Sequence, residues 1–234
     1  MNYNRKIMRL ELSTEKVLNG GYYYAELLMP AADYELKYAM QRARAVGREN
    51  TVEVSILKCD ILPELQDIRL DTFSLDELNF LAKRLAFLPD EELPVFYAVT
   101  EQIFGNAEES ENPVSTKDLI NSTYGLDTVP VAHNVSNLSE FGRFAFENEL
   151  LSDLEGIPES SVLFLNAEQI GRVQQKNDNG VFEGRQYIPT VHYELPVVYD
   201  GVTLPEEEPE NAAFFAQGRR ISEKCLFRRR PCAS

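Results

Sequence analysis

The stretch SLDELNFLAKRLAFLPDEELPVFYAVTEQIFG, residues 74–105, decides how the middle of this chain folds. Ser74 and Glu77 have the spacing of a capping box, in which each side chain bonds a free backbone N–H at the start of a helix. Leucines then recur at helical spacing as far as Pro89, which ends this helix. Pro94 is tolerated only in the first turn of a second helix. The stretch therefore predicts two amphipathic helices that place carboxylates in solvent.

The sections on either side of this stretch predict mixed structure. Before it, strands are expected over residues 8–13, 22–29 and 51–57, with a helix over 33–46 between the second and third. Gly105 is expected to end the second helix of the middle section, and residues 106–113 to form a mobile acidic linker.

Beyond the linker the sequence predicts short elements. Helices are expected over residues 115–124, 137–150 and 167–176, with a strand over 161–165. The second of these helices begins with Asn137 and Glu140, another capping signal. Asn179-Gly180 is the dipeptide that best favours a tight hairpin turn.

These patterns predict an α+β fold with four consecutive sections. Residues 1–70 form an N-terminal β-β-α-β domain, 71–130 an acidic helical domain, and 131–200 a small C-terminal α+β domain. The segment past Val197 is rich in Pro and Glu, so a linker and a basic tail over 201–234 are expected to be disordered.

The net charge of −15 is concentrated in the middle of the chain. Residues 1–70 hold ten basic and ten acidic side chains, whereas residues 71–160 hold 4 basic and 18 acidic ones. Such a field repels nucleic acids and membrane surfaces and attracts basic proteins. Direct binding of nucleic acid is therefore disfavoured, and a protein partner is expected.

The cysteines and the apolar segments indicate a cytoplasmic protein. Cys59, Cys225 and Cys232 provide no disulfide framework, which favours a reducing compartment. The first residues lack the apolar core of a signal peptide, and no window is long and apolar enough to span a membrane.

No motif of an enzyme or of a cofactor site is present. His133 and His192 have no second histidine or cysteine at metal-ligand spacing, and the Gly20-Gly21 pair lacks the lysine of a phosphate-binding loop. A pair of catalytic carboxylates stays open, but acids are so frequent that no pairing is informative. We therefore expect a protein that is not an enzyme and has no cofactor and no metal.

Carboxylates on rigid helices can occupy a groove that is built for DNA phosphates. Duplex DNA carries one negative charge per ~1.7 Å of axis, and its binding proteins meet those charges with Lys and Arg. The candidate partner-binding acids are Asp76, Glu77, Asp90, Glu91, Glu92, Glu101, Glu140, Glu147, Glu149, Asp153 and Glu155.

The segment SLDELNFLAKRLAFLPDEE, residues 74–92, resembles the helical middle of the ArdA antirestriction proteins of conjugative elements. The similarity lies in the Ser-apolar-x-Glu-Leu-Asn-x-Leu start and in the Leu-Pro and acidic continuation, and EFGRF at residues 140–144 is similar to an aromatic-Gly-Arg element of their last domain. The resemblance implies an acidic dimer that mimics DNA and blocks type I restriction–modification enzymes. Residues from about 162 onward have no counterpart, and the first section is electrically neutral.

Two other classes of function stay open at the level of sequence. One is a non-enzymatic interaction module of a mobile element that binds a basic protein. The other is a hydrolase with two convergent carboxylates, which would require a concave pocket.

Overall fold

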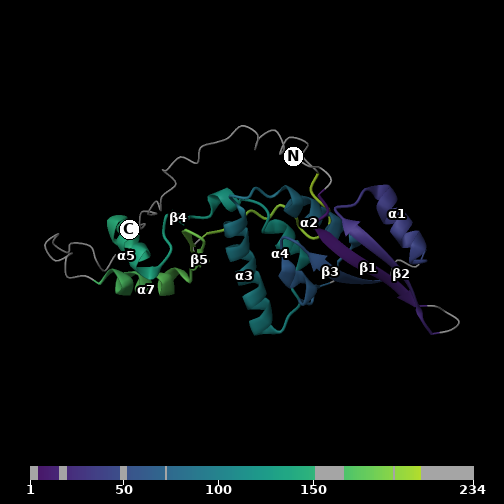
Figure 1. Cartoon of the computed structure of the whole chain (residues 1–234), viewed down its shortest axis with the longest axis horizontal. Helices are drawn as coiled ribbons and strands as arrows, with labels where there is room; N and C mark the ends of the chain where they lie inside the picture. Colours follow the sequence, from purple (N-terminus) through teal and green to yellow (C-terminus); the bar gives the residue numbers. More distant parts are fainter. Residues whose placement is uncertain are drawn as a thin grey trace. The chain divides into compact units, whose positions relative to one another are not determined.

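The computed structural model describes residues 5–15, 20–47, 52–71, 73–150, 166–191 and 193–206. It has the expected α+β composition, with helices and two three-stranded sheets (Figure 1). The chain divides into two compact units. The first contains Met1–Pro89, Asn106–Thr123 and Tyr199–Leu204, and the second contains Asp90–Gly105, Tyr124–Val198 and Pro205–Ser234. Each unit thus combines segments that lie far apart in the sequence.

The N-terminal β-β-α-β arrangement is present in the first unit. Its elements are β1 (Met8–Glu15), β2 (Tyr22–Met29), α1 (Asp33–Arg42) and β3 (Glu53–Cys59). The sheet is antiparallel in the order β2-β1-β3. Leu10 is fully buried and lies opposite Leu27 on β2 and Ile56 on β3, so apolar side chains line one face. Helix α1 ends earlier than predicted, because Arg44 has a left-handed φ of 51° that an α-helix does not allow; the Thr14 hydroxyl donates to the carbonyl of Ala43, the C-cap residue.

Helices α2 (Leu75–Phe87) and α4 (Thr116–Asn121) complete the first unit, together with the 3₁₀ turn η2 (Pro63–Gln66). The predicted capping box of α2 is confirmed: the Glu77 amide donates to Ser74 Oγ at 3.1 Å, and the Ser74 amide donates to Glu77 Oε2 at 2.6 Å. The buried Asn79 on α2 bonds both backbone groups of Ala31, at 2.7 and 2.9 Å. This amide bridge fixes α2 against the turn that follows β2.

Helix α3 (Leu93–Ser110) has Pro94 in its first turn, as predicted. The expectation that Gly105 ends this helix is wrong, because residues 106–110 continue it. The predicted mobile linker is therefore helical over most of its length. A glycine inside a helix costs only about 1 kcal/mol relative to alanine, which the rest of a long helix readily offsets.

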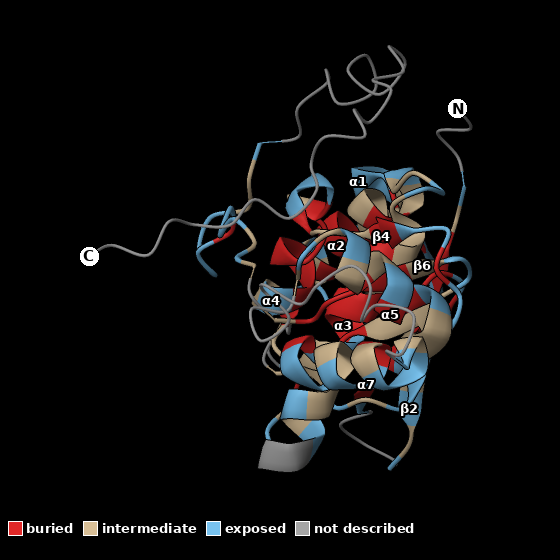
Figure 2. Ribbon diagram, turned by 90° about the vertical axis from the view of Figure 1, so that its left-hand side faces the viewer, coloured by how far each residue is buried: buried red, intermediate tan, exposed pale blue. Residues whose placement is uncertain are grey.

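In the second unit, helices α5 (Leu138–Glu147) and α7 (Ala167–Asp178) cross at a pair of glycines. A Cβ added to Gly142 would lie 1.7 Å from the Ala167 carbonyl oxygen, and one added to Gly171 would lie 2.0 Å from the Leu138 carbonyl oxygen. The contact is thus reciprocal, from each glycine to the first residue of the other helix. Figure 2 shows the two helices side by side with their outer faces exposed.

The two crossing helices share a sequence pattern. Asn137 and Asn166 each accept a hydrogen bond as the N-cap of their helix, and each is followed five residues later by Gly-Arg. The shared spacing places a glycine at the same position of both helices, which explains the reciprocal crossing.

A small sheet of β4 (Ala132–His133), β6 (Gln186–Ile188) and β5 (Val181–Glu183), in that order, packs on α5. Phe141 of α5 stacks on Tyr187 of β6 with ring centroids 3.6 Å apart. The predicted hairpin turn at Asn179-Gly180 is wrong. Asn179 takes a left-handed conformation that ends α7, and the turn between β5 and β6 lies at Gly184-Arg185 instead.

The segment just after Val197 contributes a buried tyrosine to the first unit. Tyr199 is buried, and its backbone N–H and C=O both bond the side chain of Asn121 on α4, at 2.8 and 2.9 Å. The predicted strand over 161–165 and the basic tail lie outside the described residues. None of the described helices is sufficiently long and apolar to cross a lipid bilayer.

Candidate acidic surface and a polar cleft

The helices position most of the candidate acids in solvent. Asp76 is exposed in the first turn of α2, Asp90 and Glu91 are exposed just before α3, and Glu101 is exposed on α3 itself. Glu147 is exposed at the end of α5. The described ion pairs of the chain, Lys6–Glu35, Lys58–Asp60 and Arg172–Glu168, include none of these five acids.

Two candidate acids have structural partners. Glu77 accepts from the Ser74 amide through one oxygen and from the Tyr199 hydroxyl, at 2.8 Å, through the other. Both oxygens are thus engaged, and Glu77 is half-buried, so its carboxylate belongs to the interior contacts of the first unit. Glu140 accepts from the Ser136 amide at 2.8 Å as part of the α5 cap, but it remains exposed.

The remaining candidates differ in their surroundings. Glu92 is half-buried at the start of α3, whereas Glu149 is exposed after α5 with a positive φ of 52°. Asp153 and Glu155 lie outside the described residues. Within the second unit, Asp90, Glu91 and Glu92 are consecutive, and Glu140 and Glu147 share a face of α5 because they are two helical turns apart.

One acid of the second unit is buried. The Tyr187 hydroxyl donates to Asp178 Oδ1, and Gln174 Nε2 donates to Asp178 Oδ2 at 3.1 Å. Burial raises the pKa of Asp178 above its ordinary value, against the opposing effect of these hydrogen bonds. Burial, together with the Asp178 carboxylate, also raises the pKa of Tyr187. Both groups are fully partnered and enclosed, so they stabilise the fold and do not face a substrate.

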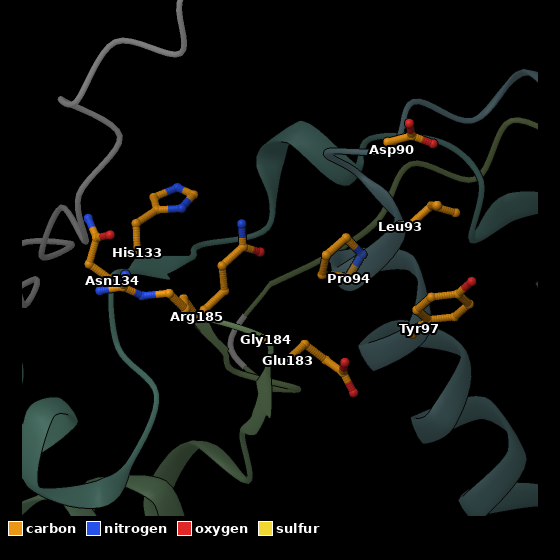
Figure 3. Close-up of a pocket in the computed structure, with 10 residues that line it drawn as sticks. Asp90, Leu93, Pro94, Tyr97, His133, Asn134, Glu183, Gly184 and Arg185 are labelled. Carbon is orange, nitrogen blue, oxygen red and sulfur yellow. The ribbon is translucent and has the colours of Figure 1, made fainter.

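The exposed side of the small sheet forms a polar cleft with the start of α3 (Figure 3). The cleft measures about 680 Å³. In the register of the sheet, Gln186 on the central strand lies opposite His133 on one side and Glu183 on the other. The three side chains therefore form a row across the strands, on the face opposite the Tyr187 core. The residues that line the cleft are Asp90, Leu93, Pro94, Tyr97, His133, Asn134, Glu183, Gly184, Arg185 and Gln186.

The sequence did not reveal this row of residues. If the hairpin turn lies at Asn179-Gly180, Glu183 and Gln186 both follow the turn on one strand. They then cannot be cross-strand neighbours, and their alignment with His133 is not predicted. The sequence signal that could have located them is Gly184, because glycine favours tight turns; in the structure it has a φ of +60°.

In the described part of the chain, no group of three or more histidine, cysteine, aspartate or glutamate side chains is placed to hold a metal ion. The arrangement can present negative charge to a basic surface and can accept hydrogen bonds inside the cleft. Neither a scan against protein-family models nor a search of curated proteins finds a match to this chain.

Proposed function

We propose that this protein is an ArdA-like antirestriction protein, an acidic DNA mimic that occupies the DNA-binding groove of type I restriction–modification enzymes. It acts without enzymatic chemistry, in the cytoplasm and as a homodimer. The observation that supports the proposal is the set of five exposed carboxylates without an ion-pair partner among the described residues: Asp76, Asp90, Glu91, Glu101 and Glu147.

The absence of ion pairs matters because a paired carboxylate has little charge to offer. An acid that faces a lysine of its own chain is already neutralised, whereas an unpaired one can replace a phosphate against a basic groove. Lysine and arginine are scarce in the same section, with 4 among residues 71–160.

Helix geometry gives part of this charge a spacing close to that of DNA. Glu140 and Glu147 are seven residues apart on α5, which corresponds to ~10.5 Å of helix rise. Three nucleotide steps along one DNA strand span ~10.2 Å of the duplex axis. A rigid helix holds this spacing without the entropy loss that a flexible acidic segment would suffer on binding.

A pair of variants with equal charge tests the proposal. The first neutralises Asp76→Asn, Glu91→Gln, Glu101→Gln and Glu147→Gln. The control neutralises four exposed acids of the neutral N-terminal section, Glu26→Gln, Glu53→Gln, Glu64→Gln and Asp67→Asn. At about 0.5 kcal/mol for each lost contact, the first variant needs about thirtyfold more protein to protect DNA from a type I enzyme.

The control variant should protect DNA as well as the natural sequence does. Equal loss in both variants would show that only the net charge matters, and no loss in either would contradict the proposed surface. Capture of one unrelated basic protein, without protection of DNA, would favour the interaction module of a mobile element instead.

A further inference from the structure

The N-terminal sheet of the first unit has an open edge at β2. In the described part of the chain, β1 is the only strand that pairs with β2, which lies at the outer end of the order β2-β1-β3 (Figure 1). The two strands stay in one continuous register along the whole length of β2. An edge strand of this kind presents a row of backbone N–H and C=O groups that a further strand can bind.

The opposite edge of the same sheet is protected, whereas β2 is not. β3 packs against the 3₁₀ turn η2, and its register with β1 shifts between Arg9 and Leu10. Its charged residues Glu53 and Lys58 are exposed. Irregular pairing, exposed charges and a covering segment are the features by which natural sheets prevent association between edges. β2 has no bulge and no proline, and Glu26 is its only charged residue.

The solvent-facing side of β2 is largely apolar. Tyr22 is 43% exposed, Tyr24 is 55% exposed and Leu28 is 49% exposed, and alternation along the strand places all three on one face with Glu26. The ring centroids of Tyr22 and Tyr24 are 6.1 Å apart. An exposed apolar row beside an open edge favours a partner strand that covers both.

The pattern along β2 fits a second copy of the same strand. Antiparallel pairing keeps both solvent-facing rows on one side of the sheet only if directly opposed residues belong to the same row. With a two-fold axis at Ala25, Tyr22 lies opposite Leu28 of the second copy, and Tyr24 lies opposite its Glu26. The two Glu26 carboxylates then stay apart. An axis at Glu26 would oppose them directly, and an axis at Tyr24 would leave Leu28 beyond the paired residues.

We propose that β2 is a dimer interface, in which two copies pair antiparallel about an axis at Ala25 and join their three-stranded sheets into one. That the protein forms a dimer is part of the proposed function, on which this inference rests, but the choice of β2 rests on the sheet itself. The exposed parts of these side chains and one strand edge per copy amount to roughly 1,000 Å² in total, which is at the low end for a stable interface. The dimer should therefore dissociate on dilution.

Sedimentation velocity and hydrogen–deuterium exchange of the full chain, over a range of protein concentrations, test the interface. We expect a reversible equilibrium between monomer and dimer. The backbone amides of β2 should exchange more slowly as the dimer forms, because they gain hydrogen bonds across the axis, whereas those of β3 should not change. β3 thus serves as a control edge within the same sheet.

A matched pair of variants at Tyr24 tests the register. Tyr24→Lys and Tyr24→Glu both remove the exposed ring, but lysine faces Glu26 of the second copy as an opposite charge and glutamate faces it as a like charge. Each contact occurs twice in the dimer, so Tyr24→Glu should dimerise at least about tenfold more weakly than Tyr24→Lys. Glu53→Lys, which reverses an exposed charge on β3, should leave the dimer unchanged. Urea unfolding of each variant shows whether the fold is retained.

A chain that stays monomeric, a dimer in which the β2 amides exchange at an unchanged rate, or equal dimerisation of the two Tyr24 variants would overturn the interface. Protection of the β2 amides that occurs only after a type I enzyme is added would assign the strand to that enzyme and overturn self-pairing.

The outcome is separate from that of the DNA-mimic proposal. A dimer through β2 that does not protect DNA would uphold the interface and contradict the mimic. Protection of DNA by a protein that does not pair through β2 would do the reverse.

Discussion

Asp178 has a feature that is typical of functional sites, but its contacts show that it stabilises the fold. It is an acid with a shifted pKa, a feature often found at functional sites. Yet both of its oxygens are bonded, by Tyr187 and Gln174, and Tyr187 is stacked against Phe141. A Cβ on Gly180 would lie 2.4 Å from the Tyr187 ring, so the chain is fitted closely around this pair. The cluster connects the end of α7 to β6.

The raised pKa of Asp178 predicts a stability that depends on pH. The folded state holds this proton more tightly than the unfolded state, whose value is near 3.8. The free energy of unfolding therefore falls as the pH rises from that value through the raised folded pKa, and it recovers on acidification. Relative to Asp178→Asn, the natural protein should gain stability as the pH is lowered from neutrality toward 3.8.

Urea unfolding of both proteins at a series of pH values from neutrality down to just above 3.8 measures this difference. Tyr187→Phe serves as a companion variant, because the Tyr187 hydroxyl favours the charged form of Asp178. Its removal should make the gain on acidification larger. A difference between the natural protein and Asp178→Asn that is constant with pH would contradict the account.

Single residues also mark where sequence patterns stop being informative. The spacing of Ser74 and Glu77 was sufficient to predict the α2 cap. It could not show that the second oxygen of Glu77 bonds Tyr199, which comes from a distant part of the chain. Burial and this carboxylate raise the pKa of Tyr199 to about 12. Partners of this kind depend on the fold and leave no local pattern.

At the scale of elements, the crossing of α5 and α7 depends on two glycines, Gly142 and Gly171, because neither has a Cβ. The atoms nearest to a Cβ at Gly142 or Gly171 are backbone atoms of the opposite helix, which cannot rotate away as a side chain can. The helices would have to separate, and the packing of Phe141 on the adjacent sheet would change with them.

Gly142→Ala should therefore destabilise the protein by about 3 kcal/mol or more. Gly171→Ala should have a similar effect, and the double variant should cost less than the sum, because one separation of the helices accommodates both methyl groups. The matched control is Gly105→Ala on α3, where a Cβ meets nothing within 4 Å. It should stabilise the protein by about 0.5–1 kcal/mol.

Urea unfolding of each variant measures these changes in the free energy of unfolding. A shifted midpoint with an unchanged m-value gives the change directly. Additive effects of the two alanines, or a Gly142→Ala variant as stable as the natural sequence, would show that the helices do not cross at these glycines.

The elements that were predictable are those with local signals. A run of strand-forming residues, a side-chain capping box and Pro94 were sufficient to predict β2, α2 and the start of α3. The errors concern residues with more than one conformational use. Gly105 lies within a helix, and Asn179 ends one with a left-handed φ of 47°, where a hairpin turn was expected. Sequence favours both uses, and tertiary packing selects one.

At the scale of the whole molecule, acidic side chains greatly outnumber basic ones in the middle of the chain but not in its first 70 residues. The −15 net charge and its location in residues 71–160 follow from sequence alone. Which carboxylates are exposed and unpaired does not, because it depends on where α2, α3 and α5 place them. Glu77 was among the candidates and is engaged internally, whereas Asp76 beside it is exposed.

The most direct measurement of the central claim is displacement of labelled DNA from a type I methyltransferase, followed by fluorescence anisotropy over a range of salt concentrations. The account predicts full displacement by the natural protein at physiological salt. It also predicts an apparent affinity for the enzyme that falls steeply as salt rises, as for a ligand held by many charge contacts. DNA that stays bound in the presence of excess protein would contradict the claim.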